Sequence, residues 1–288
     1  MGDVTILSFQ SRVSYGCVGH GAAEFTLRRI GLDVCPIDTV RLSNHPGYGR
    51  CRGGAIAGAE IQELVVGLEE IGVLARCRAV LSGYLGTAAA GEVALAAAAK
   101  VRATRPRAPY CCDPVMGDRG SGLYVPDDLV AFFREVAVPA ADIAVPNHFE
   151  LEVLAGRPLP SLADALAAAS ALRERRPRLV CVTSLAMPEL GAALGTLLVD
   201  GGGAWLIATP HLAIDAKGAG DVLSALLLAH LLAELPPAAA LERAVASTFA
   251  VVEATLAAGK RELALVAAQD ALIAPQRLFA AETLTAAS

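Results

Sequence analysis

Short apolar runs alternate with longer amphipathic segments along nearly all of the 288 residues, and this alternation is the feature that most limits the possible folds. Consecutive β-α-β units pack well only when the strands run parallel and the helices cover the sheet. The alternation therefore predicts an α/β fold with a mostly parallel central sheet and helices on both faces. Because no Pro- or Ser-rich linker and no block of charge divides the chain, residues 1–288 are expected to form a single domain.

The apolar pattern also gives the expected bounds of the elements. The expected strands are Val4–Phe9, Val34–Val40, Ala79–Ser82, Tyr110–Asp113, Ile143–Val145, Leu179–Thr183, Thr196–Val199 and Trp205–Ala208. The expected helices are His20–Ile30, Ala59–Ile71, Thr87–Thr104, Asp127–Glu135, Asp221–Glu234 and Ala238–Ala258. A further helix is expected to start with a capping box of Ser161 and Asp164 and to end at Arg175. Ligands of such sheets bind beyond the carboxyl ends of the strands, so the loops that follow strands are the places to search for chemistry.

Composition narrows the possible partners and the compartment. The net charge of −5 argues against nucleic acid as the main partner, because backbone phosphates require a basic face. Although 55% of the residues are hydrophobic, the longest uncharged apolar stretch, Val222–Ala233, is shorter than the ~20 residues that cross a bilayer. Seven irregularly spaced cysteines without a CxxC pair indicate a reduced protein without a zinc site. The N-terminus lacks the pattern of a signal peptide, so the expected location is the cytoplasm.

The most informative segment is DAKGAGDVLSA, residues 215–225. The small residues Gly218, Ala219 and Gly220 directly precede a long apolar helix, and backbone N–H groups at a helix start form an anion site. A carboxylate there would repel a phosphate, so Asp221 makes chemical sense as a base that takes a proton from a hydroxyl while the amides stabilise a transferred phosphoryl group. From the spacing alone, Asp221 could equally be a cap of the helix.

Missing motifs exclude or weaken several other catalytic classes. The chain has no GxxxxGK[ST] segment, so it is not a P-loop enzyme. It has no GxGxxG after a strand, which removes support for a dinucleotide-binding fold. It also has no GxSxG segment, which argues against a serine hydrolase.

Polar oxygen ligands follow two neighbouring strands. Asp113 ends one expected strand, and Asn147 and Glu150 follow the next one. Carboxylates at adjacent strand ends suit Mg²⁺, which prefers oxygen ligands and keeps several of its waters. The alternative is that these are ordinary loop residues and that Glu150 is a carboxylate at the N-terminus of a helix.

Three further loops after strands carry hydroxyl, imidazole and aromatic groups that suit a flat polar ring. They are FQSRVSYG at 9–16, SNHPGYG at 43–49 and SGYLG at 82–86. The alternative is that their Ser, Asn and Gly residues merely form turns and that His45 is a hydrogen-bonded structural residue.

In chain order, these segments resemble the pyridoxal kinases of the ribokinase superfamily, which have a three-layer α/β/α fold. The matching segments are FQSRVSYG, AAEFTLRRIG, SNHPGYG, LSGYLG, CDPVMGD, PNHFELEVL and GAGD, at family-like intervals over nearly the whole chain. The DPVM element also occurs in hydroxymethylpyrimidine kinases, whereas FQSRVSYG and the SNH loop favour the vitamin B6 branch. The resemblance implies phosphorylation of the 5′-hydroxymethyl group of pyridoxal by a homodimer that uses ATP and Mg²⁺, with a monovalent cation as a further candidate.

The resemblance also assigns roles to single residues. It implies that Asp221 is the general base and that the amides of Gly218, Ala219 and Gly220 form the anion hole. The substrate-binding residues that it implies, besides Asp221, are Ser11, His45, Pro46, Gly47 and Tyr84. It assigns Asp113 and Glu150 to Mg²⁺ and the phosphates. The residues that it places along the ATP site are Asp113, Val145, Glu150, Thr183, Ser184, Thr209, Pro210, His211 and Leu212.

The chain departs from some relatives at three places. Leu123 stands where some bacterial members have a cysteine, and Thr183 stands where some have lysine. The segment between His211 and Gly218 is shorter than in some relatives.

Two other functions stay open: a hydroxymethylpyrimidine kinase, and a protein that binds pyridoxal or its phosphate without turnover. The intact GAGD segment favours catalysis over binding alone.

Overall fold

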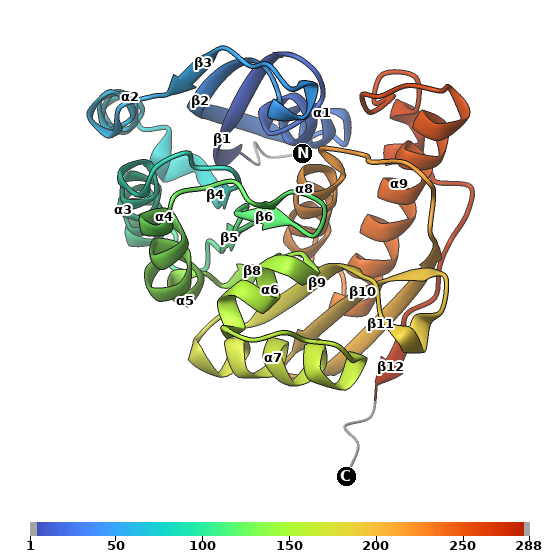
Figure 1. Cartoon of the computed structure of the whole chain (residues 1–288). Helices are drawn as coiled ribbons and strands as arrows, with labels where there is room; N and C mark the ends of the chain where they lie inside the picture. Colours follow the sequence, from blue (N-terminus) through green and yellow to red (C-terminus); the bar gives the residue numbers. More distant parts are fainter. Residues whose placement is uncertain (1–4, 285–288) are drawn as a thin grey trace.

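The computed structural model describes residues 5–284 and contains one ten-stranded sheet with helices on both faces (Figure 1). The strands are β1 Thr5–Tyr15, β2 Asp33–Asn44, β3 Gly53–Ala55, β4 Cys77–Ser82, β5 Tyr110–Cys112, β6 Gly117–Asp118, β7 Gly122–Leu123, β8 Ile143–Ala144, β9 Leu179–Leu185, β10 Ala193–Asp200, β11 Gly203–Pro210 and β12 Glu282–Leu284. The helices are α1 His20–Arg29, α2 Gly58–Glu70, α3 Ala88–Thr104, α4 Asp127–Phe132, α5 Val138–Ala140, α6 His148–Ala155, α7 Leu162–Arg175, α8 Ala219–Leu232 and α9 Pro237–Ala257.

The sheet is parallel in its middle and antiparallel at its edges. Its strand order is β12-β11-β10-β9-β8-β5-β4-β1-β2-β3. The strands from β2 through β1, β4, β5 and β8 to β9 pair in parallel. At the edges, β3 pairs antiparallel with β2, and β10, β11 and β12 continue antiparallel from β9. The predicted mostly parallel sheet with helices on both faces is therefore confirmed, and the parallel strands all end at one edge.

Consecutive strand residues point into two separate cores. Leu7 belongs to the core that also contains residues of α2, α3, α4, α6 and α7, whereas its neighbour Ile6 belongs to the core that contains residues of α1, α8 and α9. Leu197 and Leu198 of β10 divide between the same two cores. Burial on both faces explains why the strands appear in the sequence as continuous apolar runs rather than as alternating patterns.

Several elements differ from the bounds that the apolar pattern predicts. The first two strands were expected to end at Phe9 and Val40, but they continue in parallel pairing until Tyr15 lies opposite Asn44. Their extensions are mixed in polarity, so a search for apolar runs stops too early. The strands β3, β6, β7 and β12 and the helix α6 were not predicted, because each is too short to show a period of its own. Val4, the first residue of one expected strand, lies outside the described residues.

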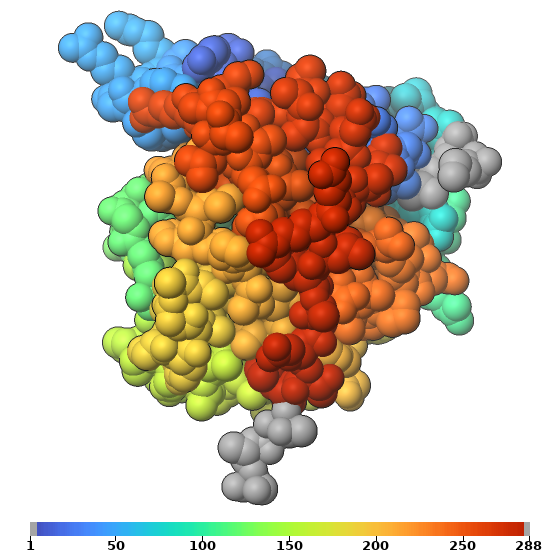
Figure 2. Space-filling model, turned by 90° about the vertical axis from the view of Figure 1, so that its right-hand side faces the viewer, coloured from blue at the N-terminus to red at the C-terminus, as the bar shows by residue number. Residues whose placement is uncertain are grey.

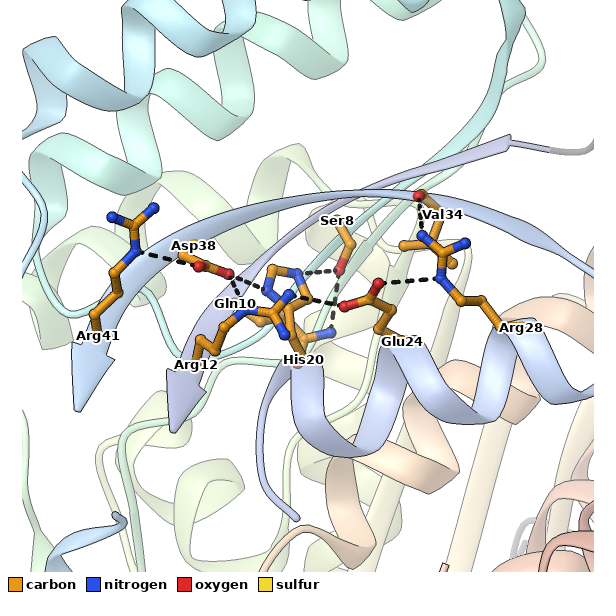
Figure 3. A network of polar contacts seen from close by, with 9 residues as sticks. All are labelled: Ser8, Gln10, Arg12, His20, Glu24, Arg28, Val34, Asp38 and Arg41. Carbon is orange, nitrogen blue, oxygen red and sulfur yellow. Dashed lines mark hydrogen bonds and ion pairs between the residues drawn. The ribbon is translucent and has the colours of Figure 1, made fainter. Parts of the chain in front are cut away.

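A buried polar network ties the start of α1 to β1 and β2 (Figure 3). The Nδ1 atom of His20 lies 2.9 Å from Oδ1 of Asp38, and its Nε2 atom lies 3.1 Å from Oγ of Ser8. Arg12 donates a further hydrogen bond of 2.9 Å to Asp38. Because His20 and Ser8 are both buried, loss of one partner would leave a buried polar group unsatisfied. The network therefore fixes the first turn of α1 and the residue before it, Gly19.

The chain after α9 returns along the outside of the molecule. Figure 2 shows this segment in red, from its start beside blue N-terminal residues to its end at β12. Asp270 in this segment forms an ion pair of 2.6 Å with Arg29 at the end of α1. At its far end, β12 pairs with β11. The C-terminal segment therefore contacts both the N-terminal part of the chain and the edge of the sheet.

Candidate active site

Asp221 lies in the first turn of α8, beside the loop that follows β1. Its Oδ2 atom accepts a hydrogen bond of 2.9 Å from the N–H of Gly19. The N-cap position of α8 belongs to Gly218, and no side chain caps this helix within the described residues. Asp221 is therefore not the helix cap, which was one of its two predicted roles. Burial raises the pKa of Asp221 to about 6, which makes its carboxylate more basic than an ordinary aspartate while leaving it ionised at neutral pH.

The segment before α8 makes a close backbone contact. Gly218 has a φ of 91°, and a Cβ atom there would lie 1.9 Å from the carbonyl oxygen of Cys17, so only glycine fits. The N–H of Ala219 donates to a carbonyl three residues earlier, so this predicted anion-hole amide is part of a turn. The N–H groups of Gly220 and Asp221 donate to no residue between 5 and 284. They lie at the positive end of the helix dipole and are available to an anion.

Asp113 and Glu150 are both buried. Asp113 follows β5 and accepts a hydrogen bond of 2.6 Å from Oγ of Ser224, one turn further along α8. Burial and the charge of Asp221 raise the pKa of Asp113 to about 7. Burial and the charge of Asp113 raise the pKa of Glu150 in turn. Carboxylates that raise one another's pKa share a region in which a cation is favourable.

Glu150 also has the helix-terminal role that the sequence left open. It forms a capping box with Asn147 at the start of α6. The N–H of Asn147 donates to Oε2 of Glu150 at 2.8 Å, and the N–H of Glu150 donates to the side chain of Asn147 at 2.9 Å. Oε1 of Glu150 accepts from the N–H of Met116 at 2.9 Å. The backbone therefore fixes both oxygens, each of which keeps a lone pair for water or a metal.

The donor set fits Mg²⁺ that is shared with a phosphorylated ligand. Between residues 5 and 284, no group of three or more His, Cys, Asp and Glu side chains could hold a metal. Mg²⁺ at phosphates does not need such a cage, because one or two carboxylates, phosphate oxygens and waters complete its shell. Asp113 and Glu150 supply two buried carboxylates whose mutual repulsion a cation would relieve.

The predicted ring loops lie at the same edge of the sheet as Asp221. A Cβ atom on Gly19 would lie 2.2 Å from the carbonyl oxygen of Ser11 and 2.5 Å from its Oγ, so Ser11 packs directly against the residue that donates to Asp221. Tyr84 follows β4, and its ring lies 6.3 Å from that of Tyr124. Partial desolvation and the charges of the acidic residues of the site raise the pKa of Tyr124, although 46% of this residue is exposed. The Tyr84 loop is therefore also close to the carboxylates.

His45 lies in the loop after β2, and Pro46–Tyr48 form a 3₁₀ turn directly after it. The His45 side chain is buried, and its Nε2 atom lies 3.0 Å from Oε1 of Glu262. A Cβ atom on Gly47 would lie 2.8 Å from the imidazole ring, so this position follows the ring closely. Glu262 could not be found from the sequence, because it is 217 residues away from His45 and belongs to no local motif.

The residues expected along the ATP site have different environments. Thr183 forms an isolated parallel bridge with Asn147. Ser184 has a φ of 56°, an uncommon conformation for a residue with a side chain and one that is frequent at functional sites. Val145 is 2% exposed and packs with the core of α1, α8 and α9. Thr209 and Pro210 are the last residues of β11, and His211 and Leu212 follow this strand. Because β9 and β11 both pair antiparallel with β10, they run in the same direction.

One further contact near the start of α8 was not predicted. The Nζ atom of Lys217, in the turn before α8, lies 2.8 Å from Oδ2 of Asp118 and 3.2 Å from Oδ1 of Asp215. Asp118 belongs to the hairpin of β6 and β7. The ion pair therefore ties this hairpin to the start of the catalytic helix candidate, α8.

Solved structures with the same fold support a kinase. Pyridoxal kinase from Leishmania donovani in complex with ADP and pyridoxamine is 31% identical, with a TM-score of 0.91, and the match covers 98% of this chain and 100% of that chain. Pyridoxal kinase from Trypanosoma brucei is 30% identical, with a TM-score of 0.88, over 99% of this chain and 100% of that one. The fold and the site together define a ribokinase-like kinase of small molecules.

Sequence comparisons give the family. The family model described as phosphomethylpyrimidine kinase matches residues 69–265. Pyridoxal kinase PdxY from Rubrobacter xylanophilus is 48% identical over 280 residues, covering 96% of this chain and 97% of that protein. Pyridoxal kinase PdxY from Deinococcus radiodurans is 46% identical over 284 residues, covering 96% and 95%. The chain belongs to the pyridoxal kinase family.

Proposed function

We propose that this protein transfers the γ-phosphoryl group of ATP to the 5′-hydroxymethyl oxygen of pyridoxal, and that Asp221 is the base in this reaction. The observation that carries the proposal is the position of Asp221. Its carboxylate lies in the first turn of α8, has a pKa raised to about 6 by burial, and is held by Gly19 rather than by the helix. A base of this kind is poised to take the proton of an attacking hydroxyl.

The neighbouring groups supply the remaining requirements of phosphoryl transfer, which are mainly position and charge stabilisation. The free N–H groups of Gly220 and Asp221, together with the N–H of Gly218, would bind the oxygens of the transferred group at the positive end of α8. The N–H of Ala219 is used in a turn and would not take part. Ser11, His45, Pro46, Gly47 and Tyr84 would hold the pyridine ring. Thr183, Ser184 and the loop from Thr209 to Leu212 would lie along the nucleotide.

Asp113 and Glu150 would hold Mg²⁺ at the phosphates, through water or directly. When bound, Mg²⁺ would neutralise phosphate charge. The residues themselves are fixed for this role, Asp113 by Ser224 and Glu150 by the capping box and by Met116.

We also propose a cytoplasmic homodimer, on the strength of the family. Among the helices of residues 5–284, none has the length and apolarity to cross a membrane.

The substrate assignment predicts a preference between two small alcohols. With Mg²⁺ and ATP, kcat/KM should be higher for pyridoxal than for hydroxymethylpyrimidine, because Ser11, His45 and Tyr84 are proposed to hold a pyridine ring. Formation of each phosphorylated product by the purified protein measures this. Equal or reversed values would contradict the pyridoxal assignment and leave the kinase fold intact. Binding of pyridoxal without any product would support the alternative of a binding protein.

The metal assignment predicts loss of turnover in EDTA and recovery on addition of Mg²⁺. Glu150→Gln should raise the Mg²⁺ concentration for half-maximal rate by about tenfold, because the substitution removes the charge. Its NH₂ group also replaces one of the two oxygens that accept backbone N–H groups, so the thermal midpoint is measured alongside the rate. Pyridoxal affinity should change less. Glu60→Gln is the matched control, since Glu60 is an exposed acidic residue in the first turn of α2. Unchanged turnover without a divalent metal would contradict this role of the pair.

A further inference from the structure

Glu262 lies in the loop after α9, and its carboxylate contacts two loops from the start of the chain. Its side chain is 13% exposed. Oε1 lies 3.0 Å from Nε2 of His45 and accepts a hydrogen bond of 2.6 Å from the hydroxyl of Tyr48. Oε2 accepts a hydrogen bond of 2.9 Å from the N–H of Cys17. A single carboxylate therefore joins the loop after β2 to the loop after β1.

Arg261 strengthens the same connection. Its guanidinium carbon lies 3.9 Å from the centre of the Tyr48 ring, a favourable cation–π distance. It also donates a hydrogen bond to the carbonyl oxygen of Gly47. The rings of Tyr48 and His45 lie 4.9 Å apart. Two consecutive residues of the loop after α9 thus hold segment 45–48, whose single 3₁₀ turn has little stability of its own.

The neighbours of Glu262 stabilise its charged form. Burial alone would raise the pKa of Glu262, but hydrogen bonds from Tyr48, from the N–H of Cys17 and from His45 outweigh it and hold this pKa below its usual value. The same contact raises the pKa of Tyr48 to about 12. Glu262 is therefore an anion at neutral pH, and Tyr48 is a neutral donor.

An anion at this position also determines how His45 presents its imidazole. Because a carboxylate can only accept, the proton of a neutral His45 is placed on Nε2, toward Glu262. Nδ1 then remains as the acceptor. A carboxylate that accepts from one ring nitrogen of a histidine sets both the plane of the ring and its tautomer.

The same carboxylate is connected to the phosphoryl-transfer centre. The N–H of Cys17 is bound by Glu262, and the carbonyl oxygen of Cys17 packs against Gly218. Two residues further on, Gly19 donates to Asp221. The segment 16–19 therefore lies between Glu262 and the start of α8, with contacts at both ends.

We propose that Glu262 is a positioning residue for substrate binding, which acts through His45 by fixing the orientation and tautomer of its imidazole and by tying loops 45–48 and 16–19 together. This inference rests on the proposed role of His45 at the pyridine ring. It adds to the site a residue that is remote in sequence and that does not itself need to touch the substrate.

The first test is Glu262→Gln, which keeps the shape of the side chain and removes its charge. The KM for pyridoxal should rise by about tenfold, whereas the KM for ATP and the thermal midpoint should stay near wild type. Glu253→Gln, an exposed position on α9, is the matched control for loss of one negative charge. If Glu262→Gln unfolds the protein, Tyr48→Phe removes one donor from the same carboxylate and should raise the pyridoxal KM alone. An unchanged pyridoxal KM in a folded variant would overturn the inference.

A double-mutant cycle with His45→Ala shows whether Glu262 acts through His45. His45→Ala should raise the pyridoxal KM, and the addition of Glu262→Gln should then raise it by less than about threefold more. Multiplied effects would mean that Glu262 acts by another route, which would overturn the inference but not the function. A wild-type pyridoxal KM in His45→Ala would instead reject the proposed ring contact of His45, and kinase activity toward pyridoxal in the parent protein tests the function separately.

Discussion

Asp221→Asn should lower kcat by about 10²- to 10⁴-fold, or roughly 3–5 kcal/mol of barrier, because it removes a positioned general base. The fold should not change. Asparagine has nearly the same size, and its Oδ1 atom can still accept the hydrogen bond from Gly19. Asp221 caps no helix in the structure, so the loss of about 1 kcal/mol that follows removal of a cap is not expected.

Three measurements separate these outcomes for Asp221→Asn: kcat, pyridoxal binding and the thermal midpoint. The catalytic role requires kcat to collapse while the other two stay near wild type. Asp127→Asn, in the exposed first turn of α4, controls for loss of a carboxylate at a helix start. If kcat of Asp221→Asn stays within about threefold of wild type, the barrier is not lowered by this carboxylate and the kinase proposal loses its main support.

The second large effect is expected from Gly218→Ala. A Cβ atom at this position would lie 1.9 Å from the carbonyl oxygen of Cys17, which is a backbone atom and can move only with its loop. Either segment 16–19 or the start of α8 must shift, and both hold groups of the proposed transfer centre. Since displacement of reacting groups by about 1 Å can cost about 10²-fold in rate, kcat should fall by about that factor or more.

Gly31→Ala is a close control for Gly218→Ala. Gly31 has a φ of 89°, against 91° for Gly218, but a Cβ atom on Gly31 would meet nothing within 4 Å. Both variants therefore carry the same backbone strain, and only one carries the clash. The comparison of kcat and thermal midpoint isolates the close approach. Equal kcat values in the two variants would show that the contact of Gly218 with Cys17 does not affect the reaction.

The sequence was informative about the fold where elements are buried. The central strands and α8 contribute to the two cores, so their apolar runs predicted them, even where a strand is as short as β5 or β8. Elements that depend on a partner were missed. β3 has three exposed residues, Gly53–Ala55, and exists only through its pairing with β2. The polar ends of β1 and β2 are strands because they pair with each other, which no single-segment pattern indicates.

The same distinction applies to the site. Asp221, Asp113 and Glu150 belong to local segments with recognisable chemistry, so the sequence singled them out. The alternative that Asp221 caps α8 could be excluded only with coordinates, which place Gly218 at the N-cap and the Asp221 carboxylate against Gly19, 202 residues away. Glu262 had no local signal at all. Its role depends on three contacts that only the folded chain brings together.

The place of Glu262 in the chain has a consequence for biosynthesis. The loops that carry Ser11, His45 and Tyr84 leave the ribosome first, whereas the residue that joins two of them is made after α9. A nascent chain can form its first strands and helices early, since domains acquire structure as they emerge. The contacts of Glu262 with His45, Tyr48 and Cys17 can form only after the segment that follows α9 has been made. The proposed orientation of His45 is therefore a late event in synthesis, although His45 itself is made early.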